Sequence, residues 1–128
     1  MAQASYPADL LYHSEHDWAR VEDDEATFGI TWYAQDALGE VVYFDVPKIG
    51  ATVSSGEAYA EVESVKAVSD VYAPLSGEIV AVNDALADQP EAINEDPYGN
   101  GWLVKVKLSD PSERDGLMDA AAYEASLT

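Results

Sequence analysis

The chain of 128 residues has no cysteine and no long apolar run, and each absence excludes a class of protein. Without cysteine it can form no disulfide, no thiol nucleophile and no thiolate metal site. No apolar run approaches the roughly 18 residues that span a membrane. The first residues, Met1 to Tyr6, also lack the basic start and apolar core of a signal peptide. The sequence therefore predicts a cytoplasmic protein without a membrane partner.

Basic residues are also scarce, because only 6 lysines and arginines accompany 25 aspartates and glutamates. The formal net charge of −19 repels phosphate backbones and anionic membranes, so nucleic acid is excluded as a partner. Two explanations of the acidity stay open. It can be a solubility adaptation to a salty cytoplasm, or it can steer the protein toward basic faces on partner enzymes.

The hydrophobic fraction of 48% is enough to bury a core. The length predicts one domain over residues 1–128, with residues 1–9 as a flexible lead. Short β-branched and aromatic runs separated by Gly and Pro predict a mainly β sandwich or barrel. The predicted strands are 18–21, 26–30, 41–46, 57–65, 68–73, 77–82 and 102–107.

Short helices complete the predicted secondary structure. Thr31 is expected to cap a helix that runs to Leu38 and stops at Gly39. The other expected features are a helical turn within 83–90, a turn-rich loop over 94–101, a helical segment opened by Pro111 and a terminal helix over 118–127.

Lys66 is the most unusual residue of the chain. It lies between the runs 57–65 and 68–73, and so few residues separate these runs that a tight turn is expected. A lone lysine among short apolar residues at a hairpin tip is an exposed and rigidly held amine, which suits covalent modification. Two Pro-x-x-Gly stretches, 47–50 and 74–77, would fit two quasi-symmetric halves with this turn between them. We therefore predict a carrier whose chemistry belongs to an attached cofactor.

Other candidate chemistry is weak. His13 and His16 lie near acidic groups, but two histidines without a defined third ligand favour surface or packing roles over a metal site. Ser64 and Ser69 flank Lys66 without a histidine close by in the sequence to activate them. No glycine-rich phosphate loop is present. The sequence thus predicts no catalytic residue and no metal.

The segment Glu63-Ser64-Val65-Lys66-Ala67-Val68-Ser69-Asp70, followed by residues 72–78, resembles the lipoyl attachment site of the H proteins of the glycine cleavage system. The resemblance extends to Glu15-His16-Asp17-Trp18 and to the segments 29–39, 94–99 and 119–123, and so covers nearly the whole chain. It implies the barrel-sandwich hybrid fold of biotinyl and lipoyl domains. That fold is a flattened β-barrel of two quasi-symmetric halves, with short helices and a C-terminal helix.

The resemblance implies lipoic acid in amide linkage on Lys66 and a non-catalytic, monomeric shuttle. Such a carrier takes an aminomethyl group from a pyridoxal-phosphate glycine decarboxylase to an aminomethyltransferase, and then presents the dithiol to dihydrolipoyl dehydrogenase. A lipoate-attaching enzyme is a further partner, and the family pattern associates Glu63 and Gly77 with its action. Gly77 also has a plain structural explanation, which is a turn that needs positive φ.

The family pattern also marks Asp17 and Asp70 as carboxylates that can face the arm, where they would suit a cationic amine. Both can instead be ordinary solvated acids in so acidic a chain. Trp32 and Ala37 depart from the pattern, because relatives have aspartate or another residue at the first position and can have histidine at the second.

Several alternatives stay open beside the glycine cleavage carrier. An H-like protein that relays lipoate to other complexes would share the fold and the attachment site. A biotin carrier is disfavoured because Val65 and Ala67 stand where that family has methionines. A lipoyl domain of a 2-oxoacid dehydrogenase would normally continue into linkers and a catalytic domain. An unmodified interaction module would show no added mass on Lys66 after expression with an active ligase.

Overall fold

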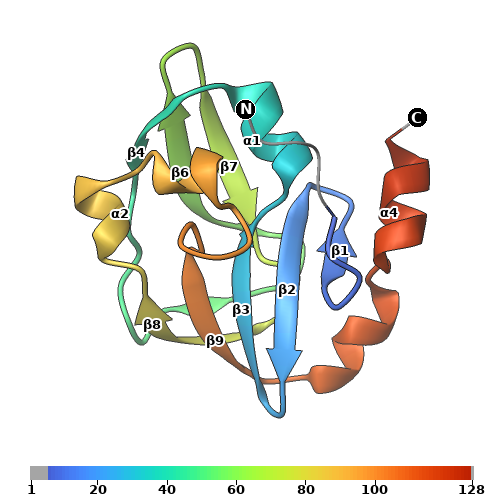
Figure 1. Ribbon diagram of the computed structural model, residues 1–128. Helices are drawn as coiled ribbons and strands as arrows, with labels where there is room; N and C mark the ends of the chain where they lie inside the picture. The colour runs from blue at the N-terminus through green and yellow to red at the C-terminus, as the bar shows by residue number, and fades with distance from the viewer. Residues whose placement is uncertain (1–5, 128) are drawn as a thin grey trace.

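The computed structural model of the chain describes residues 6–127, which fold into two antiparallel β-sheets with short helices around them (Figure 1). Residues 1–5 of the predicted flexible lead lie outside the described residues. The described part of the lead contacts the body of the protein, since the Tyr6 ring packs edge-on against Tyr123 with 5.5 Å between ring centroids. Within residues 6–127 no helix is long and apolar enough to cross a membrane.

The strands divide into a larger and a smaller sheet. The larger sheet has the order β1-β2-β3-β9-β8-β5, with β1 Leu11–His13, β2 Asp17–Glu22, β3 Glu25–Ile30, β5 Thr52–Val53, β8 Gly77–Val82 and β9 Val104–Leu108. The smaller sheet has the order β4-β6-β7, with β4 Val41–Phe44, β6 Ala58–Ser64 and β7 Val68–Tyr72. The predicted mainly β, sandwich-like architecture is confirmed. The described strands form two separate sheets, however, and not one closed barrel.

The first helix, α1 Trp32–Leu38, begins and ends where the sequence predicts. At the start of the helix, the Thr31 hydroxyl accepts a hydrogen bond from the backbone N–H of Ala34 at 3.2 Å. At its end, Gly39 has a φ of 81°, a left-handed conformation that residues with a side chain rarely adopt. The other helical elements are α2 Ala85–Asp88, α3 Ala92–Glu95, the 3-10 helix η1 Pro111–Gly116 and α4 Ala120–Ser126. The predicted short helices and C-terminal helix are therefore present.

Three short elements are missing from the sequence prediction. β1, β5 and α3 have only 3, 2 and 4 residues, too few to show a hydrophobic period. α3 falls partly in the stretch 94–101 that the sequence assigns to a loop.

Three predicted boundaries are wrong by two residues, and several others by one. The terminal helix begins at Ala120 and not at 118, because Met118 exchanges backbone hydrogen bonds with Tyr12. β9 begins two residues late, since the Trp102 N–H donates to the preceding turn. β4 ends at Phe44, shortly before Pro47, which has no N–H for a ladder.

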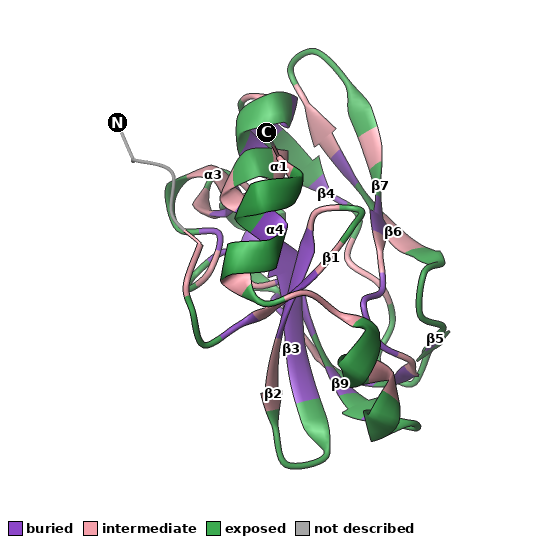
Figure 2. Cartoon of the chain, turned by 90° about the vertical axis from the view of Figure 1, so that its right-hand side faces the viewer, coloured by how far each residue is buried: buried purple, intermediate pink, exposed green. Residues whose placement is uncertain are grey.

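The core lies where the two sheets face each other, and this places the hairpin between β6 and β7 at the edge of the molecule. Phe28 of β3, Val62 of β6 and Ile79 of β8 belong to one buried cluster. A second cluster holds Tyr12 and Tyr123, whose rings stack at 4.8 Å and join α4 to β1. The β6–β7 tip stands clear of both clusters and is exposed (Figure 2).

Candidate functional site: the Lys66 hairpin and the adjoining cleft

The turn that carries Lys66 is short and internally bonded. β6 and β7 pair up to Glu63 and Val68, and beyond this pair the Ser64 N–H donates to the Ala67 carbonyl at 2.8 Å. The Ser64 hydroxyl accepts the N–H groups of Lys66 at 3.3 Å and Ala67 at 3.1 Å. These bonds confirm the predicted tight turn and hold the lysine at its exposed tip.

The tip also leans on the end of α1. The Val65 N–H donates to the Glu40 carbonyl at 3.0 Å. The stem of Lys66 lies over Gly39, where an added β-carbon would stand 3.2 Å from the Lys66 Cε. Because Gly39 has no side chain, the lysine stem can rest against the α1–β4 corner. The Lys66 side chain therefore has a defined position beside the last turn of α1.

Asn94 fixes this corner from the other side. Its amide Nδ2 donates to the Gly39 carbonyl at 2.8 Å and to Gln35 Oε1 at 3.0 Å, while its Oδ1 accepts the Val41 N–H at 2.8 Å. One side chain thus joins the end of α1 to the start of β4. The sequence analysis placed Asn94 in a turn and missed this role, which no local pattern reveals because the partners lie more than 50 residues away.

A cleft of about 300 Å³ opens beside the hairpin, between α1, the start of β2 and β7. β7 is an edge strand of the smaller sheet, so residues 67–71 form one wall. Tyr33, Ala37 and Leu38 of α1 form the opposite wall. Ala37 and Leu38 directly precede Gly39, on which the Lys66 stem rests. The lysine therefore lies at one end of the cleft.

The two predicted aspartates both line this cleft, but at different depths. Asp17 is 1% exposed, whereas Asp70 of β7 is an exposed residue. Burial raises the pKa of the Asp17 carboxyl well above its ordinary value, and a hydrogen bond from the Tyr72 backbone N–H opposes this rise. The Oδ2 atom of Asp17 has no hydrogen-bond partner within residues 6–127. A buried carboxylate oxygen without a partner is costly and marks a site that a polar ligand can complete.

His16 is a cleft residue whose connections could not be predicted. It has a left-handed backbone with a φ of 73°, and its ring lies 4.6 Å from the Tyr33 ring between centroids. Its Nδ1 is 2.7 Å from the Tyr123 hydroxyl, which also lies 2.8 Å from the Thr31 hydroxyl. Desolvation lowers the pKa of the His16 ring, and the negative charge of Glu15 partly opposes this by raising it. The terminal helix thereby reaches the wall of the cleft.

His13 and His16 do not form a pair of ligands. The Nδ1 of His13 accepts the Glu15 N–H at 3.1 Å, so the two rings have separate partners. Within residues 6–127 no cluster of three or more potential metal-ligating side chains has a suitable geometry.

Glu63 and Gly77 lie apart from the cleft. Glu63 precedes the turn and pairs with Tyr43 on one side and Val68 on the other. Gly77 opens β8, and a β-carbon there would collide with the Lys107 carbonyl and the Val106 side chain of β9. The sequence-based explanation of a positive φ at Gly77 is wrong, because the left-handed glycines are Gly39, Gly50 and Gly56. The glycine is needed for close approach of β8 and β9.

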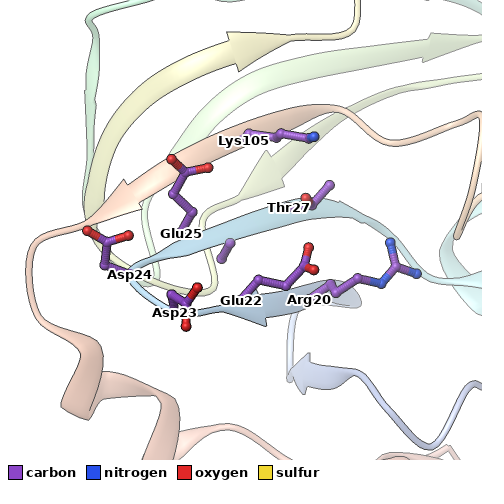
Figure 3. A pocket seen from close by; sticks show the side chains of 8 residues that line it. Arg20, Glu22, Asp23, Asp24, Glu25, Thr27 and Lys105 are labelled. Carbon is purple, nitrogen blue, oxygen red and sulfur yellow. The ribbon is translucent and has the colours of Figure 1, made fainter.

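A second hollow lies at the β2–β3 turn (Figure 3), at the opposite end of the fold from the β6–β7 hairpin (Figure 1). Its volume is about 330 Å³, and charged side chains of both signs line it, among them Arg20, Glu25 and Lys105. It shares no lining residue with the cleft. Four carboxylates and two cationic side chains line this open surface, and their arrangement indicates no specific ligand.

A compact β fold that holds one lysine at a bonded hairpin tip, beside a cleft with a buried carboxyl group that has one unpaired oxygen, is the arrangement of a carrier protein. The model of the family described as glycine cleavage H-protein matches residues 10–128. The chain belongs to this family, whose members are the carrier component of the glycine cleavage system and are not themselves catalysts.

Similar proteins agree with the assignment over nearly the full length. The glycine cleavage system H protein of Escherichia coli (strain K12 / DH10B) is 57% identical over 125 residues, which are 97% of each chain. The H protein of Salmonella newport (strain SL254) gives the same values. The crystal structure of a glycine cleavage system H protein from Mycobacterium marinum matches with a TM-score of 0.86 and 40% identity, covering 94% of this chain and 98% of that one.

Proposed function

We propose that Lys66 carries lipoic acid in amide linkage and that the chain shuttles an aminomethyl group on this arm. The donor is the glycine decarboxylase, the acceptor is the aminomethyltransferase, and dihydrolipoyl dehydrogenase reoxidises the dithiol. The observation that carries the proposal is the position of Lys66, whose amine is exposed at a bonded tip in a chain of this family. Bound lipoate supplies the redox chemistry of its dithiolane ring, and the protein chain positions the lipoyl group.

The residues present fit such an arm. The Lys66 stem already lies over Gly39, so a group on its Nζ begins next to Ala37 and Leu38 at the end of the cleft. The lining there is apolar, as suits a hydrocarbon arm. The only fully buried carboxylate of the lining, Asp17, has a free oxygen. A cationic amine at the far end of the arm would give that oxygen its missing partner.

Electrostatics then makes docking of the lipoyl arm in the cleft depend on whether the arm carries its cargo, the aminomethyl group. Lipoylation replaces the Lys66 ammonium by a neutral amide, and the amino group of the cargo returns one positive charge at the other end of the arm. Asp70 at the rim can attract this charge, and Asp17 at the floor can hold it away from water. A neutral arm gains nothing from either carboxylate. The loaded arm would therefore dock and the unloaded arm would leave the cleft.

The attachment step involves two further residues. We assign Glu63 to direct recognition by the lipoate-attaching enzyme, since it lies three residues before Lys66 on the same hairpin. Gly77 contributes indirectly, because it allows β8 to pack against β9. The acidic surface would guide the carrier to basic faces on its partners. We further propose that the protein acts as a cytoplasmic monomer.

The test is the mass of Lys66 in the whole chain. The protein is produced with an active lipoate ligase and with lipoate, and its intact mass is followed by peptide mapping. One lipoyl increment on the peptide that contains Lys66, and glycine-dependent reduction of the modified protein by the decarboxylase, are the expected results. A lipoyl group on Lys48, Lys105 or Lys107 instead, or no increment, would contradict the proposal.

A further inference from the structure

Tyr59 of β6 is a buried ionisable residue that the shuttle mechanism does not use. Its hydroxyl oxygen is one of three side-chain polar atoms that are buried without a hydrogen-bond partner within residues 6–127, and Asp17 Oδ2 is another. A buried polar atom without a partner costs free energy, so such atoms are few in folded proteins. The position of the two atoms relative to each other therefore needs an explanation.

A β-bulge turns the Tyr59 side chain inward. Two adjacent residues of β7, Tyr72 and Val71, pair with Ala58 and Ala60 of β6, so Tyr59 is the extra residue between the two pairs. Regular alternation along β6 would place residues 59 and 60 on opposite faces of the sheet. Tyr59 and Ala60 instead both pack against the core. The bulge thus brings into the interior a hydroxyl that a regular strand would point outward.

The redirected ring reaches the part of the larger sheet that holds Asp17. Tyr59 packs edge-on against Phe28 with 6.1 Å between ring centroids. Phe28 is a diagonal cross-strand neighbour of Asp17 on the β2–β3 pair, so both side chains are on the inner face of that sheet. The backbone N–H that hydrogen-bonds to Asp17 is that of Tyr72, which pairs with β6 directly beside the bulge. Asp17 and Tyr59 are therefore brought together from two sides.

The two groups also interact electrostatically. Burial raises the pKa of the Tyr59 hydroxyl well above its ordinary value, and the negative charge of Asp17 raises it further. The hydroxyl therefore keeps its proton and can donate it in a hydrogen bond. No direct hydrogen bond joins it to Asp17 Oδ2 within the described residues. A water molecule can accept from the hydroxyl and donate to the carboxylate, and buried waters in proteins typically bridge such groups.

We propose that one buried water joins the Tyr59 hydroxyl to Asp17 Oδ2, and that Tyr59 is thereby a positioning residue that holds the Asp17 carboxylate for the amine of the cargo. A carboxylate oxygen accepts more than one hydrogen bond, so the amine can still reach Oδ2 from the cleft. Asp17 lines the cleft and Tyr59 does not, so Tyr59 acts on the cargo only through Asp17. The inference rests on the proposed function, since it takes the cargo amine as the ligand of Asp17.

The bridge opposes the effect of burial on Asp17 without cancelling it. A hydrogen bond that the charged carboxylate accepts lowers its pKa, so loss of the Tyr59 hydroxyl should raise the pKa of Asp17 further. The other ionisable groups around Asp17 are the same in wild type and in Tyr59→Phe. They are Glu15 and His16 beside β2, Tyr33 on α1, Asp70 on β7 and Tyr123 on α4.

The first measurement uses the unmodified full-length chain and needs no cargo. The NMR signals of the side-chain carboxyl carbons are followed against pH in wild type and in Tyr59→Phe, and Asp17→Asn assigns the Asp17 signal. The pKa of Asp17 should rise by about 0.5–1 pH unit in Tyr59→Phe, as expected for the loss of one hydrogen bond. Tyr43→Phe is the matched control, because Tyr43 is 49% exposed on the same sheet and should leave this pKa unchanged.

The second measurement uses the lipoylated and loaded carrier. Because the charged carboxylate holds the amine, the lifetime of the cargo relative to that in Asp17→Asn should increase as pH rises through the Asp17 pKa. The midpoint of this increase should lie about 0.5–1 pH unit higher in Tyr59→Phe than in wild type. A residue with a merely structural role would shorten the lifetime without moving the midpoint.

A crystal structure of the wild type tests the bridge without any variant. It should show one ordered water within hydrogen-bond distance of the Tyr59 hydroxyl and of Asp17 Oδ2. Separate partners for the two atoms, or an unchanged Asp17 pKa in folded Tyr59→Phe, would overturn the role of Tyr59 and leave the carrier function intact.

The remaining outcomes separate this inference from the proposed function. A raised Asp17 pKa in Tyr59→Phe, together with a wild-type chain that takes no lipoyl group on Lys66, would keep the bridge and remove the carrier function. A raised pKa with an unmoved midpoint in the loaded carrier would show that Asp17 does not hold the amine, and it would refute the positioning role of Tyr59.

Discussion

Asp17 and Asp70 face the same cleft from different depths, the first 1% exposed at its floor and the second exposed on its edge strand. A carboxylate at the rim keeps its water and interacts weakly with a cation. A carboxylate at the floor has already lost its water, so a cation that reaches it restores a missing interaction. The two acids therefore differ in what they contribute to docking of the arm.

The first prediction concerns the lifetime of the aminomethyl cargo on the isolated carrier. Asp70→Asn should shorten this lifetime by about two- to fivefold, as expected for a solvated charge pair. Asp17→Asn should shorten it by at least about tenfold, because a desolvated pair is stronger. Ammonia and formaldehyde release from the loaded protein measures the lifetime. An unchanged lifetime in the double variant would show that neither carboxylate holds the loaded arm, and equal reduction of the unloaded arm is the internal control.

The second prediction is a pH-dependent change in stability at Asp17. Burial raises the pKa of this carboxyl in the folded state, so folding favours the protonated form. The stability that protonation supplies is present below the unfolded pKa and is lost as pH rises through the raised folded pKa. Asp17→Asn removes this titration. The variant should therefore be more stable than wild type at neutral pH, and the difference should shrink as pH falls.

Urea unfolding of both proteins between pH 3 and 8 measures this difference. Asp70→Asn serves as the control, because its exposed position should leave the pH dependence close to that of wild type. If the stability of Asp17→Asn relative to wild type instead rises as pH falls, the folded protein stabilises Asp17 as a carboxylate. Asp17 would then have a partner in the free protein.

The third prediction separates the fold from the attachment step at Gly77. Gly77→Ala should lower the free energy of unfolding by about 1–3 kcal/mol, because the β-carbon meets the backbone of β9. Under conditions where the variant stays folded, Lys66 should still be lipoylated to completion. Gly116→Ala is the matched control, since a β-carbon there meets nothing within 4 Å. A fully stable Gly77→Ala protein that resists lipoylation would instead place Gly77 in the surface that the enzyme contacts.

The fourth prediction tests whether Lys66 serves only as the acceptor. Lys66→Arg should change the free energy of unfolding by no more than about 0.5 kcal/mol, because the side chain is exposed at a turn. It should abolish glycine-dependent reduction, since arginine does not form the lipoyl amide. Chemical unfolding and the assay with the decarboxylase give the two readouts. Lys48→Arg should behave as wild type in both, and residual carrier activity in Lys66→Arg would refute the role.

The sequence predicts best what local chemistry decides. Thr31 and Gly39 bound α1 because a cap and a left-handed residue act within one turn, and the turn at Lys66 follows from the few residues between two strand patterns. The depth of Asp17 could not be predicted, because it depends on α1 and β7 packing over it from distant parts of the chain. The contact of His16 with Tyr123 spans 107 residues, so no pattern around either residue indicates it.

The last prediction concerns this long-range contact. Tyr123→Phe removes the hydroxyl that meets His16 Nδ1 and Thr31 Oγ1, but it keeps the ring that stacks on Tyr12. Because the buried Thr31 and the half-buried His16 lose one hydrogen bond each, the free energy of unfolding should fall by about 1–3 kcal/mol. Amide hydrogen exchange should accelerate in α4 and around His16, more than in β8 and β9. Tyr33→Phe is the matched control, because its hydroxyl makes no hydrogen bond within the described residues, and it should change stability by less than about 0.5 kcal/mol. Uniform acceleration of exchange over the whole protein in Tyr123→Phe would show that the hydroxyl supports global stability alone, and that α4 is not specifically tied to the wall of the cleft.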